Sequence, residues 1–273
     1  MKLNIFIDGS WLFKVQNGVL KSKRIRSQGA KPVFIDFSKL SNLILKHVQA
    51  NGFPYCKEFG ERHCCISVLT LPGNLDTWEG KKISELNRHL KNNNYVVNKS
   101  DLDKVKKNCF VRDNFARSAV SAGFEANSII RPELKPWMIE NLSKGRFQEK
   151  QVDTTVVALL VKSAITKQGD VHAIIAGDAD ILPAIKIAYP EFSENILIAT
   201  THPDELKAEH RQTSFTYQEE EFNIPALYLQ DYVKEIINGE VIECSNCHYL
   251  FEPKRLMNPK KRVYCPDCES TRE

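Results

Sequence analysis

Four aspartates stand where short apolar runs end or helices begin. Asp8 closes an apolar run near the N-terminus, Asp153 opens an apolar helical segment, and Asp178 and Asp180 follow another run across a glycine. An apolar run that ends in Asp-Gly or Gly-Asp is typical of a buried strand leading into a turn. The carboxyl ends of such strands are where open α/β sheets bind ligands. Carboxylates gathered there would repel one another, and a hard divalent cation with oxygen ligands is the simplest way to hold them together.

Each of these aspartates also has a purely structural interpretation. Asp153 and Asp180 are suited to cap the helices that follow them, and Asp8 and Asp178 are suited to turns beside glycine. Asp36 also follows an apolar run, but it leads straight into a helix without a glycine. We therefore interpret Asp36 as a helix cap and leave it outside the candidate site.

Strand-like and helix-like segments alternate along the chain. Apolar runs predict strands at residues 3–8, 65–71, 172–176 and 196–200. Helical spacing of apolar residues predicts helices at residues 36–48, 77–90, 152–166, 181–188, 204–213 and 229–237. We interpret residues 14–32 as a loop or frayed hairpin and residues 94–113 as strand-like pieces with a lysine-rich turn, and we make no assignment for residues 114–150. This alternation predicts an α/β fold with a largely parallel central sheet flanked by helices.

The pattern changes at Asn238-Gly239. Beyond this pair the chain is poor in apolar residues and rich in cysteine pairs. We place a domain boundary there, with an α/β domain at residues 1–237 and a small C-terminal module at residues 238–273.

Two Cys-x-x-Cys pairs lie in the C-terminal module. Cys244 and Cys247 form the first pair, Cys265 and Cys268 form the second, and residues 248–264 separate them. This spacing is that of a zinc ribbon, in which four thiolates hold a tetrahedral Zn²⁺. Because so small and polar a segment needs a metal to fold, we expect structural Zn²⁺ rather than disulfides.

The stretch between the two pairs is basic and has no acidic residue at positions 253–263. Tyr249, Phe251 and Tyr264 are interleaved around it. Basic side chains with nearby aromatic rings suit a nucleic-acid backbone and stacked bases, although a solvated hairpin with packed aromatics has the same composition. Zinc ribbons also dock proteins, so a protein partner remains an alternative. The candidate nucleic-acid-binding residues are Lys254, Arg255, Lys260, Lys261 and Arg262.

The absence of membrane-spanning and export signals favours a cytoplasmic protein without a membrane partner. No apolar stretch approaches the ~20 residues of a membrane span, and the N-terminal apolar run is too short for a signal peptide. The other cysteines are scattered, which is typical of reduced packing residues inside a cell. The net charge of +4 is compatible with a nucleic-acid partner but carries little weight alone.

Three short motifs resemble the NYN branch of the PIN-like nuclease superfamily, the group that contains LabA-like and limkain-type domains. Residues 6–10 (Phe-Ile-Asp-Gly-Ser) are similar to its first-strand motif, and residues 150–153 (Lys-Gln-Val-Asp) to its Lys-x-Val-Asp motif at a helix start. Residues 176–180 (Ala-Gly-Asp-Ala-Asp) are similar to its Gly-Asp-x-Asp motif after a central strand. The motifs occur in the family's order, and the resemblance covers roughly residues 1–235.

The resemblance implies a PIN-like Rossmannoid domain in which Asp8, Asp153, Asp178 and Asp180 line one acidic pocket. These aspartates would bind one or two Mg²⁺ or Mn²⁺ ions and serve as the catalytic residues for hydrolysis of phosphodiester bonds. The resemblance alone favours RNA over DNA as the substrate.

The chain departs from the family pattern at two places. Trp11 stands where the family commonly has Asn, three residues after the first Asp. The interval between the first two motifs is also long, which implies an elaboration of the domain within about residues 72–150.

Three functions fit these features. The leading hypothesis is a metal-dependent endoribonuclease whose zinc ribbon helps to hold the nucleic acid. The alternative is a non-catalytic nucleic-acid-binding or adaptor protein, which Trp11 in place of Asn favours. A phosphatase for small phosphate esters is a third hypothesis, because the same acidic geometry suits that reaction.

Overall fold

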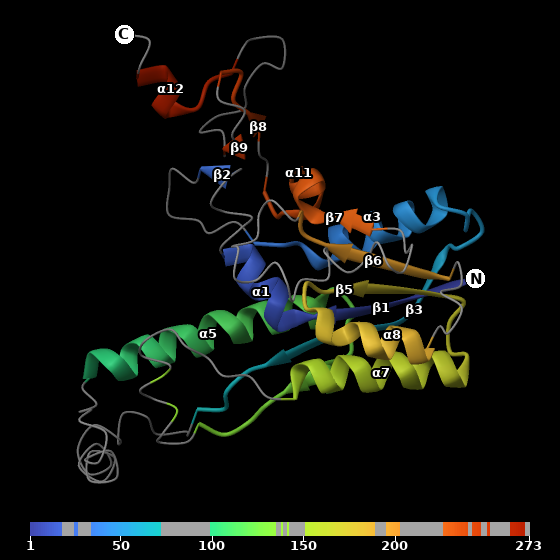
Figure 1. Cartoon of the computed structure of the whole chain (residues 1–273). Helices are drawn as coiled ribbons and strands as arrows, with labels where there is room; N and C mark the ends of the chain where they lie inside the picture. Colours follow the sequence, from blue (N-terminus) through green and yellow to red (C-terminus); the bar gives the residue numbers. More distant parts are fainter. Residues whose placement is uncertain are drawn as a thin grey trace, which may run out of the picture.

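A parallel six-stranded sheet organises the protein (Figure 1). The computed structural model describes residues 1–17, 25–26, 34–71, 99–134, 138, 141, 151–188, 195–202, 226–239, 242–246, 250–251 and 263–270. The strand order is β4-β3-β1-β5-β6-β7, and every neighbouring pair is parallel. The strands are β1 (Lys2–Asp8), β3 (Glu58–Ser67), β4 (Ile129–Ile130), β5 (Val171–Ile175), β6 (Ile196–Thr200) and β7 (Ala226–Tyr228). The α/β class with a largely parallel sheet is therefore confirmed.

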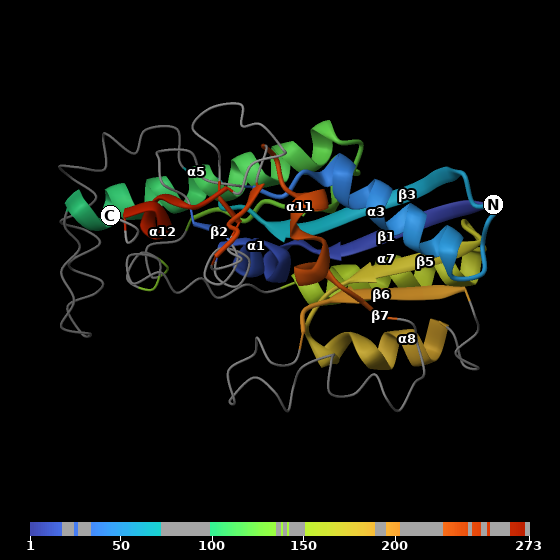
Figure 2. The ribbon, with the colours of Figure 1, turned by 90° about the horizontal axis from the view of Figure 1, so that it is seen from above.

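Helices cover both faces of this sheet. The α-helices are α1 (Gly9–Asn17), α3 (Phe37–Ala50), α5 (Lys99–Ser121), α7 (Val152–Thr166), α8 (Leu182–Ala188), α11 (Val233–Ile236) and α12 (Pro266–Ser270). Short 3-10 helices are η3 (Ala126–Ser128), η4 (Ala179–Ile181) and η7 (Leu229–Tyr232). Helices α3 and α11 lie on one face, and α7 and α8 lie on the other (Figures 1 and 2).

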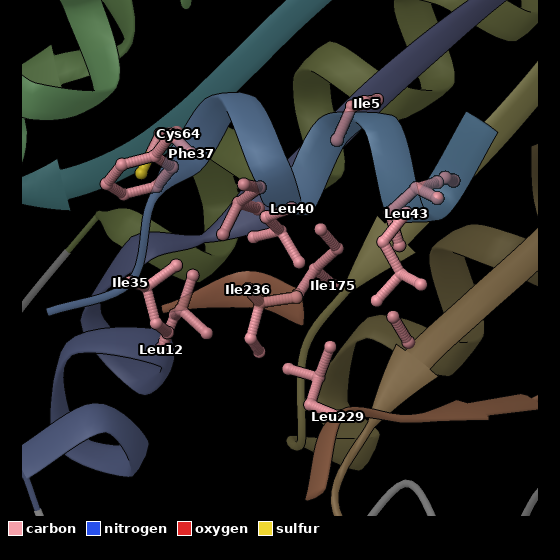
Figure 3. Packing of buried hydrophobic residues seen from close by; sticks show 14 of the residues in the cluster. Ile5, Leu12, Ile35, Phe37, Leu40, Leu43, Cys64, Ile175, Leu229 and Ile236 are labelled. Atoms are coloured by element: carbon pink, nitrogen blue, oxygen red, sulfur yellow. The ribbon is translucent and has the colours of Figure 1, made fainter. Parts of the chain in front are cut away.

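The alternation of side chains along the central strands fills two cores. In β1, Leu3, Ile5 and Ile7 join the core under α1, α3 and α11, whereas Phe6 joins the core under α7 and α8. Because both faces are buried, the strands are continuous apolar runs rather than alternating ones. Figure 3 shows how side chains from α3 and α11, including Leu40 and Ile236, meet above the sheet.

Helix α5 corrects the prediction for residues 99–113, and residues 94–98 lie outside the described part of the chain. The structure has one helix across Lys99–Ser121 in place of strand-like pieces with a lysine-rich turn. Its buried residues recur every three or four positions, which is helical spacing, but lysines separate them and obscure the pattern. The buried residues are Asp101, Leu102, Val105, Cys109, Arg112, Phe115, Ala116 and Ala119.

Two other element boundaries differ from the prediction. Helix α1 continues to Asn17, so the interpretation of residues 14–17 as loop was wrong. Strand β3 begins at Glu58 and ends at Ser67, earlier than the predicted 65–71, because its first half is only partly buried and reads as polar. Strand β7 adds a sixth strand where the sequence predicted none. The predicted helices 77–90 and 204–213 lie outside the described residues.

The C-terminal module contributes two strands to a second, small sheet. Its order is β2 (Ile25–Arg26), β9 (Leu250–Phe251) and β8 (Ile242–Glu243), so a strand from the N-terminal part of the chain pairs with the module. The chain entering α3 also pairs with the chain leaving α11, through an antiparallel bridge between Ile35 and Ile237. Two backbone contacts therefore link the region before α3 to the region around the proposed boundary.

A buried polar network lies beneath α7. The Asn4 amide donates to Ser163 Oγ at 2.8 Å, and Ser163 Oγ lies 3.0 Å from His172 Nε2. The ring of Phe6 stacks between His172 and His63, with centroid distances of 5.7 and 5.6 Å. Burial lowers the pKa of His172 to about 4, against the opposing charge of Asp170. Burial also lowers the pKa of His63. Both imidazoles are therefore neutral at pH 7.

We expect the free energy of unfolding to fall as the pH decreases from about 6.5 toward 4. In that range the unfolded chain binds a proton that folded His172 does not accept, which costs up to about 3 kcal/mol. Urea unfolding of wild type and His172→Gln at pH 7.5 and 5.0 tests this. The stability advantage of the wild type should shrink at pH 5.0 by about 2 kcal/mol. An equal difference at both pH values would contradict a neutral buried imidazole.

Candidate acidic site at the carboxyl edge of the sheet

The strand order reverses at β1 and β5, which lie side by side in the sheet. The chain leaving β1 forms α1 and α3 over one face, whereas the chain leaving β5 forms α8 over the other. Adjacent strands whose connections leave toward opposite faces open a crevice at their carboxyl ends, and ligands bind there in open α/β sheets. Asp8 ends β1, and Asp178 follows β5, so both lie at this crevice.

Asp8 is held firmly by the start of α1. Its side chain is 3% exposed, and Oδ1 accepts hydrogen bonds from the backbone N–H groups of Ser10 (3.0 Å) and Trp11 (2.9 Å). Asp36 holds α3 in the same way, with Oδ1 accepting from Ser38 and Lys39 at 3.0 Å each. The prediction that Asp36 is a helix cap is confirmed, and it provides a matched reference for Asp8.

Asp178 organises the turn after β5. Its Oδ1 accepts a hydrogen bond from the Asp180 backbone N–H at 3.1 Å, and its carbonyl accepts from the Ile181 N–H at 3.4 Å. Asp180 lies within η4, and its side chain is exposed. Asp178 thus stabilises the turn through its side chain, and the carboxylate of Asp180 is exposed to solvent.

Asp153 occupies the first turn of α7 without being its cap. The cap position belongs to Gln151, which has a left-handed φ of 81° and makes no side-chain capping bond. The Gln151 carbonyl instead accepts hydrogen bonds from the hydroxyls of Thr154 (3.0 Å) and Thr155 (2.6 Å). Because α7 leads into β5, its first turn lies at the same carboxyl edge as the other aspartates.

Electrostatics tie three of the aspartates together. Burial raises the pKa of Asp153, the negative charges of Asp178 and Asp180 raise it further, and the Lys14 ammonium opposes the shift. Asp8 joins the group through the register of β1 and β5, which pairs Ile7 with Ile175. Among described residues, the cysteine cluster of the C-terminal module is the group of three or more ligating side chains whose ligand atoms all lie within 4.8 Å. The charges of Asp178 and Asp180 therefore act on Asp153, but the carboxylate oxygens of the aspartates lie farther apart than the sulfur atoms of the cysteine cluster.

The indole ring of Trp11 packs against Gly177, in the turn after β5. A Cβ built on Gly177 would collide with the indole ring of Trp11. Gly9 is equally confined, because a Cβ there would lie 2.8 Å from Cys64 Sγ and 2.9 Å from the Cys65 carbonyl oxygen. The glycines beside Asp8 and Asp178 therefore serve close packing at the edge of the sheet, as well as turn formation.

Sequence analysis did not identify two cations near this edge. Lys14 is exposed on α1, and its charge acts on Asp153. Arg112 is buried in α5, where Nε donates to the Ser67 carbonyl at 3.0 Å and Nη2 donates to Ser10 Oγ at 3.2 Å. Its guanidinium also lies over the Phe13 ring, 5.0 Å from the centroid. Only the tertiary structure brings Arg112 to the ends of β1 and β3.

Three of the four predicted zinc ligands come together. The sulfur atoms of Cys244, Cys265 and Cys268 lie within 4.8 Å of one another, which is compatible with a bound metal ion. The Cys265 N–H donates to Cys244 Sγ at 3.3 Å, and the Asn246 amide donates to Cys268 Sγ at 3.5 Å. Such donors stabilise thiolates, so the donor set fits Zn²⁺.

The remaining candidate residues of the module are not part of the described structure. Cys247, Lys254, Arg255, Lys260, Lys261 and Arg262 lie outside the described residues.

The scattered cysteines are buried packing residues. Burial raises the pKa of Cys65 to about 12 and that of Cys109 to about 11, and it raises the pKa of Cys56 as well. Thiols in such surroundings stay protonated at neutral pH and bind metal poorly.

The chain matches no family model, no curated protein and no solved structure. In the described part of the chain, no helix is both long enough and apolar enough to cross a membrane.

Gly177→Ala should destabilise the protein by about 1–3 kcal/mol, because the new methyl group collides with the Trp11 ring. A double-mutant cycle with Trp11→Ala, measured by urea unfolding, checks this. The methyl group should cost much less in the Trp11→Ala background, which gives a coupling of about 1 kcal/mol or more. Additive effects would show that the indole does not lie over Gly177.

Purified protein should contain one Zn²⁺ per chain, measured by atomic emission after dialysis against a weak chelator. Cys265→Ser should lose the metal, because Cys265 lies in the sulfur cluster. Cys109→Ser is the matched control, since Cys109 is a buried thiol on α5 and should keep full zinc content. Full zinc content in Cys265→Ser would refute this ligand assignment.

Proposed function

We propose that the protein is a metal-dependent endoribonuclease with a PIN-like domain at residues 1–237. The observation that carries the proposal is the raised pKa of Asp153, caused by burial and by the charges of Asp178 and Asp180 at the crevice. Perturbed carboxylates that converge at a ligand-binding edge are candidates for function. The resemblance of three motifs to the NYN branch implies that the same aspartates share a pocket, and this supports the proposal independently of the geometry.

The acidic residues fit a hard divalent cation. Carboxylate oxygens are the ligands that Mg²⁺ and Mn²⁺ prefer. A cation would relieve the repulsion from Asp178 and Asp180, which adds to the effect of burial in raising the pKa of Asp153. Asp8, Asp153, Asp178 and Asp180 would hold one or two such ions. When bound, the cation supplies an activated water and offsets charge on the phosphate under attack.

The chain's own groups would position the substrate around this cation. Asp8 cannot swing away, because two backbone N–H groups of α1 hold its Oδ1. Lys14 is exposed beside Asp153 and is suited to receive a non-bridging phosphate oxygen. The Trp11 indole packs against Gly177 and occupies the space beside the Asp178 turn.

The C-terminal zinc ribbon would help to hold the nucleic acid. Its basic stretch, residues 254–262, suits phosphate contacts, and the resemblance favours RNA as the polymer. A protein partner for the ribbon fits the same module.

The alternative is a non-catalytic nucleic-acid-binding or adaptor protein. Trp11 favours it, because the indole occupies space beside Asp178 where the related family commonly carries an amide side chain. RNA binding without turnover in the presence of any divalent cation would support this alternative.

Asp178→Asn and Asp153→Asn should each reduce RNA cleavage at least 100-fold, because each substitution removes a cation ligand while keeping the shape of the side chain. The assay uses end-labelled single-stranded RNA, structured RNA and DNA with Mn²⁺, Mg²⁺ or EDTA. Asp36→Asn is the matched control, since Asp36 makes the same capping bonds at the start of α3 and is not among the charges that act on Asp153.

Cleavage that requires metal, survives in Asp36→Asn and is lost in both site variants would establish the nuclease and its polymer preference. Equal cleavage by wild type and both site variants would refute the assignment of these aspartates. No cleavage by folded, zinc-loaded wild type would favour the binding protein.

A further inference from the structure

A histidine–aspartate pair, His202 and Asp231, follows the strands β6 and β7, which come after β5 in the sheet. His202 follows β6 by two residues, and its Nε2 lies 2.9 and 3.0 Å from the two carboxylate oxygens of Asp231 in η7. The imidazole stacks on the ring of Tyr228 with a centroid distance of 4.2 Å, and its backbone N–H donates to Gln230 Oε1 at 3.1 Å. Three contacts therefore fix the position and tilt of this ring.

His202 follows a strand that neighbours β5. Strands β5 and β6 pair Ile175 with Ala199, and the Ala176 N–H donates to the Ala199 carbonyl at 3.1 Å. Because parallel strands end at the same edge of a sheet, His202 after β6 and Asp178 after β5 lie at the same carboxyl edge.

The pair leaves one ring nitrogen available. With Nε2–H donated to the Asp231 carboxylate, Nδ1 carries the lone pair of a neutral imidazole. Within the described part of the chain Nδ1 has no hydrogen-bond partner, and the side chain is 33% exposed. A carboxylate that fixes the tautomer and orientation of a histidine is the arrangement that general-base catalysis uses.

We propose that His202 is a catalytic general base of this site and that Asp231 positions it; this inference rests on the proposed nuclease activity. The Nδ1 atom takes a proton from the attacking water as the water oxygen forms its bond to phosphorus. The bond from phosphorus to the leaving sugar oxygen breaks, and that oxygen takes a proton from solvent. The imidazolium then releases its proton to solvent before the next turnover.

The charged groups around the ring fit this role. Asp231 faces it from η7, and Asp178 lies at the end of the neighbouring strand, so negative charge stabilises the imidazolium formed during the reaction. A purely structural clasp between the ends of β6 and β7 is the competing explanation for the same contacts.

His202→Gln should lower kcat/KM for metal-dependent RNA cleavage about 100-fold at pH 7.5, within the usual range for general-base catalysis. The loss should appear in kcat and leave KM unchanged, because a general base acts on the chemical step rather than on binding. Asp231→Asn should lower kcat about 10-fold, again without a change in KM. His47→Gln, on α3, is the control and should leave both constants unchanged.

A second readout does not depend on turnover. Substoichiometric Mn²⁺ alone should broaden the imidazole NMR signals of His202 through paramagnetic relaxation, and Asp178→Asn should abolish this broadening. The signals of His47, which lies in the last turn of α3, should stay sharp.

The outcomes separate the two proposals. A loss in His202→Gln that appears in KM alone, or no loss at all, with wild-type cleavage intact would overturn the general base and leave the nuclease standing. Unbroadened His202 signals would likewise overturn its place at the site. Absence of cleavage by the wild type on every polymer would overturn the nuclease and, with it, the catalytic role of His202.

Discussion

Repulsion between carboxylates is the constraint on which the rest of this structure depends. The parallel sheet delivers Asp8 and Asp178 to one edge, and α7 adds Asp153 from below, so negative charges meet in a partly buried crevice. Burial raises the pKa of Asp153, and the charges of Asp178 and Asp180 raise it further. Lys14 opposes this charge from α1, and Arg112 brings a buried cation to the ends of β1 and β3. A bound cation would complete the neutralisation.

Close packing keeps the carboxylates in place despite their repulsion. Glycine at positions 9 and 177 lets α1 and the indole of Trp11 approach the sheet closely. Gln151 holds a left-handed backbone conformation that costs a non-glycine residue about 1 kcal/mol or more. That turn starts α7 so that Asp153 lies in its first turn without capping it. One strained residue, Gln151, and the tight contacts at Gly9 and Gly177 thus lie at the edge where the charges converge.

Local patterns predicted much of this arrangement, and long-range contacts account for the rest. Apolar runs revealed β1, β5 and β6, and the residues after them gave Asp8 and Asp178, because strand periodicity and turn chemistry are local. Helix α5 was missed because lysines interrupt its buried positions, and the burial of Arg112 depends on tertiary contacts. His202 is likewise a polar residue that follows a strand. Its partner Asp231 follows a different strand, β7, so only the sheet topology brings the two residues together.

The central claim is that the aspartates at the β1–β5 crevice form one cation site. The most direct measurement is an anomalous difference map from crystals of the full chain grown with Mn²⁺. We predict a manganese peak at the carboxyl edge, bound by carboxylate oxygens of Asp8, Asp153 and Asp178. A well-ordered map with no manganese at this crevice, or with manganese only elsewhere on the protein, would contradict the account.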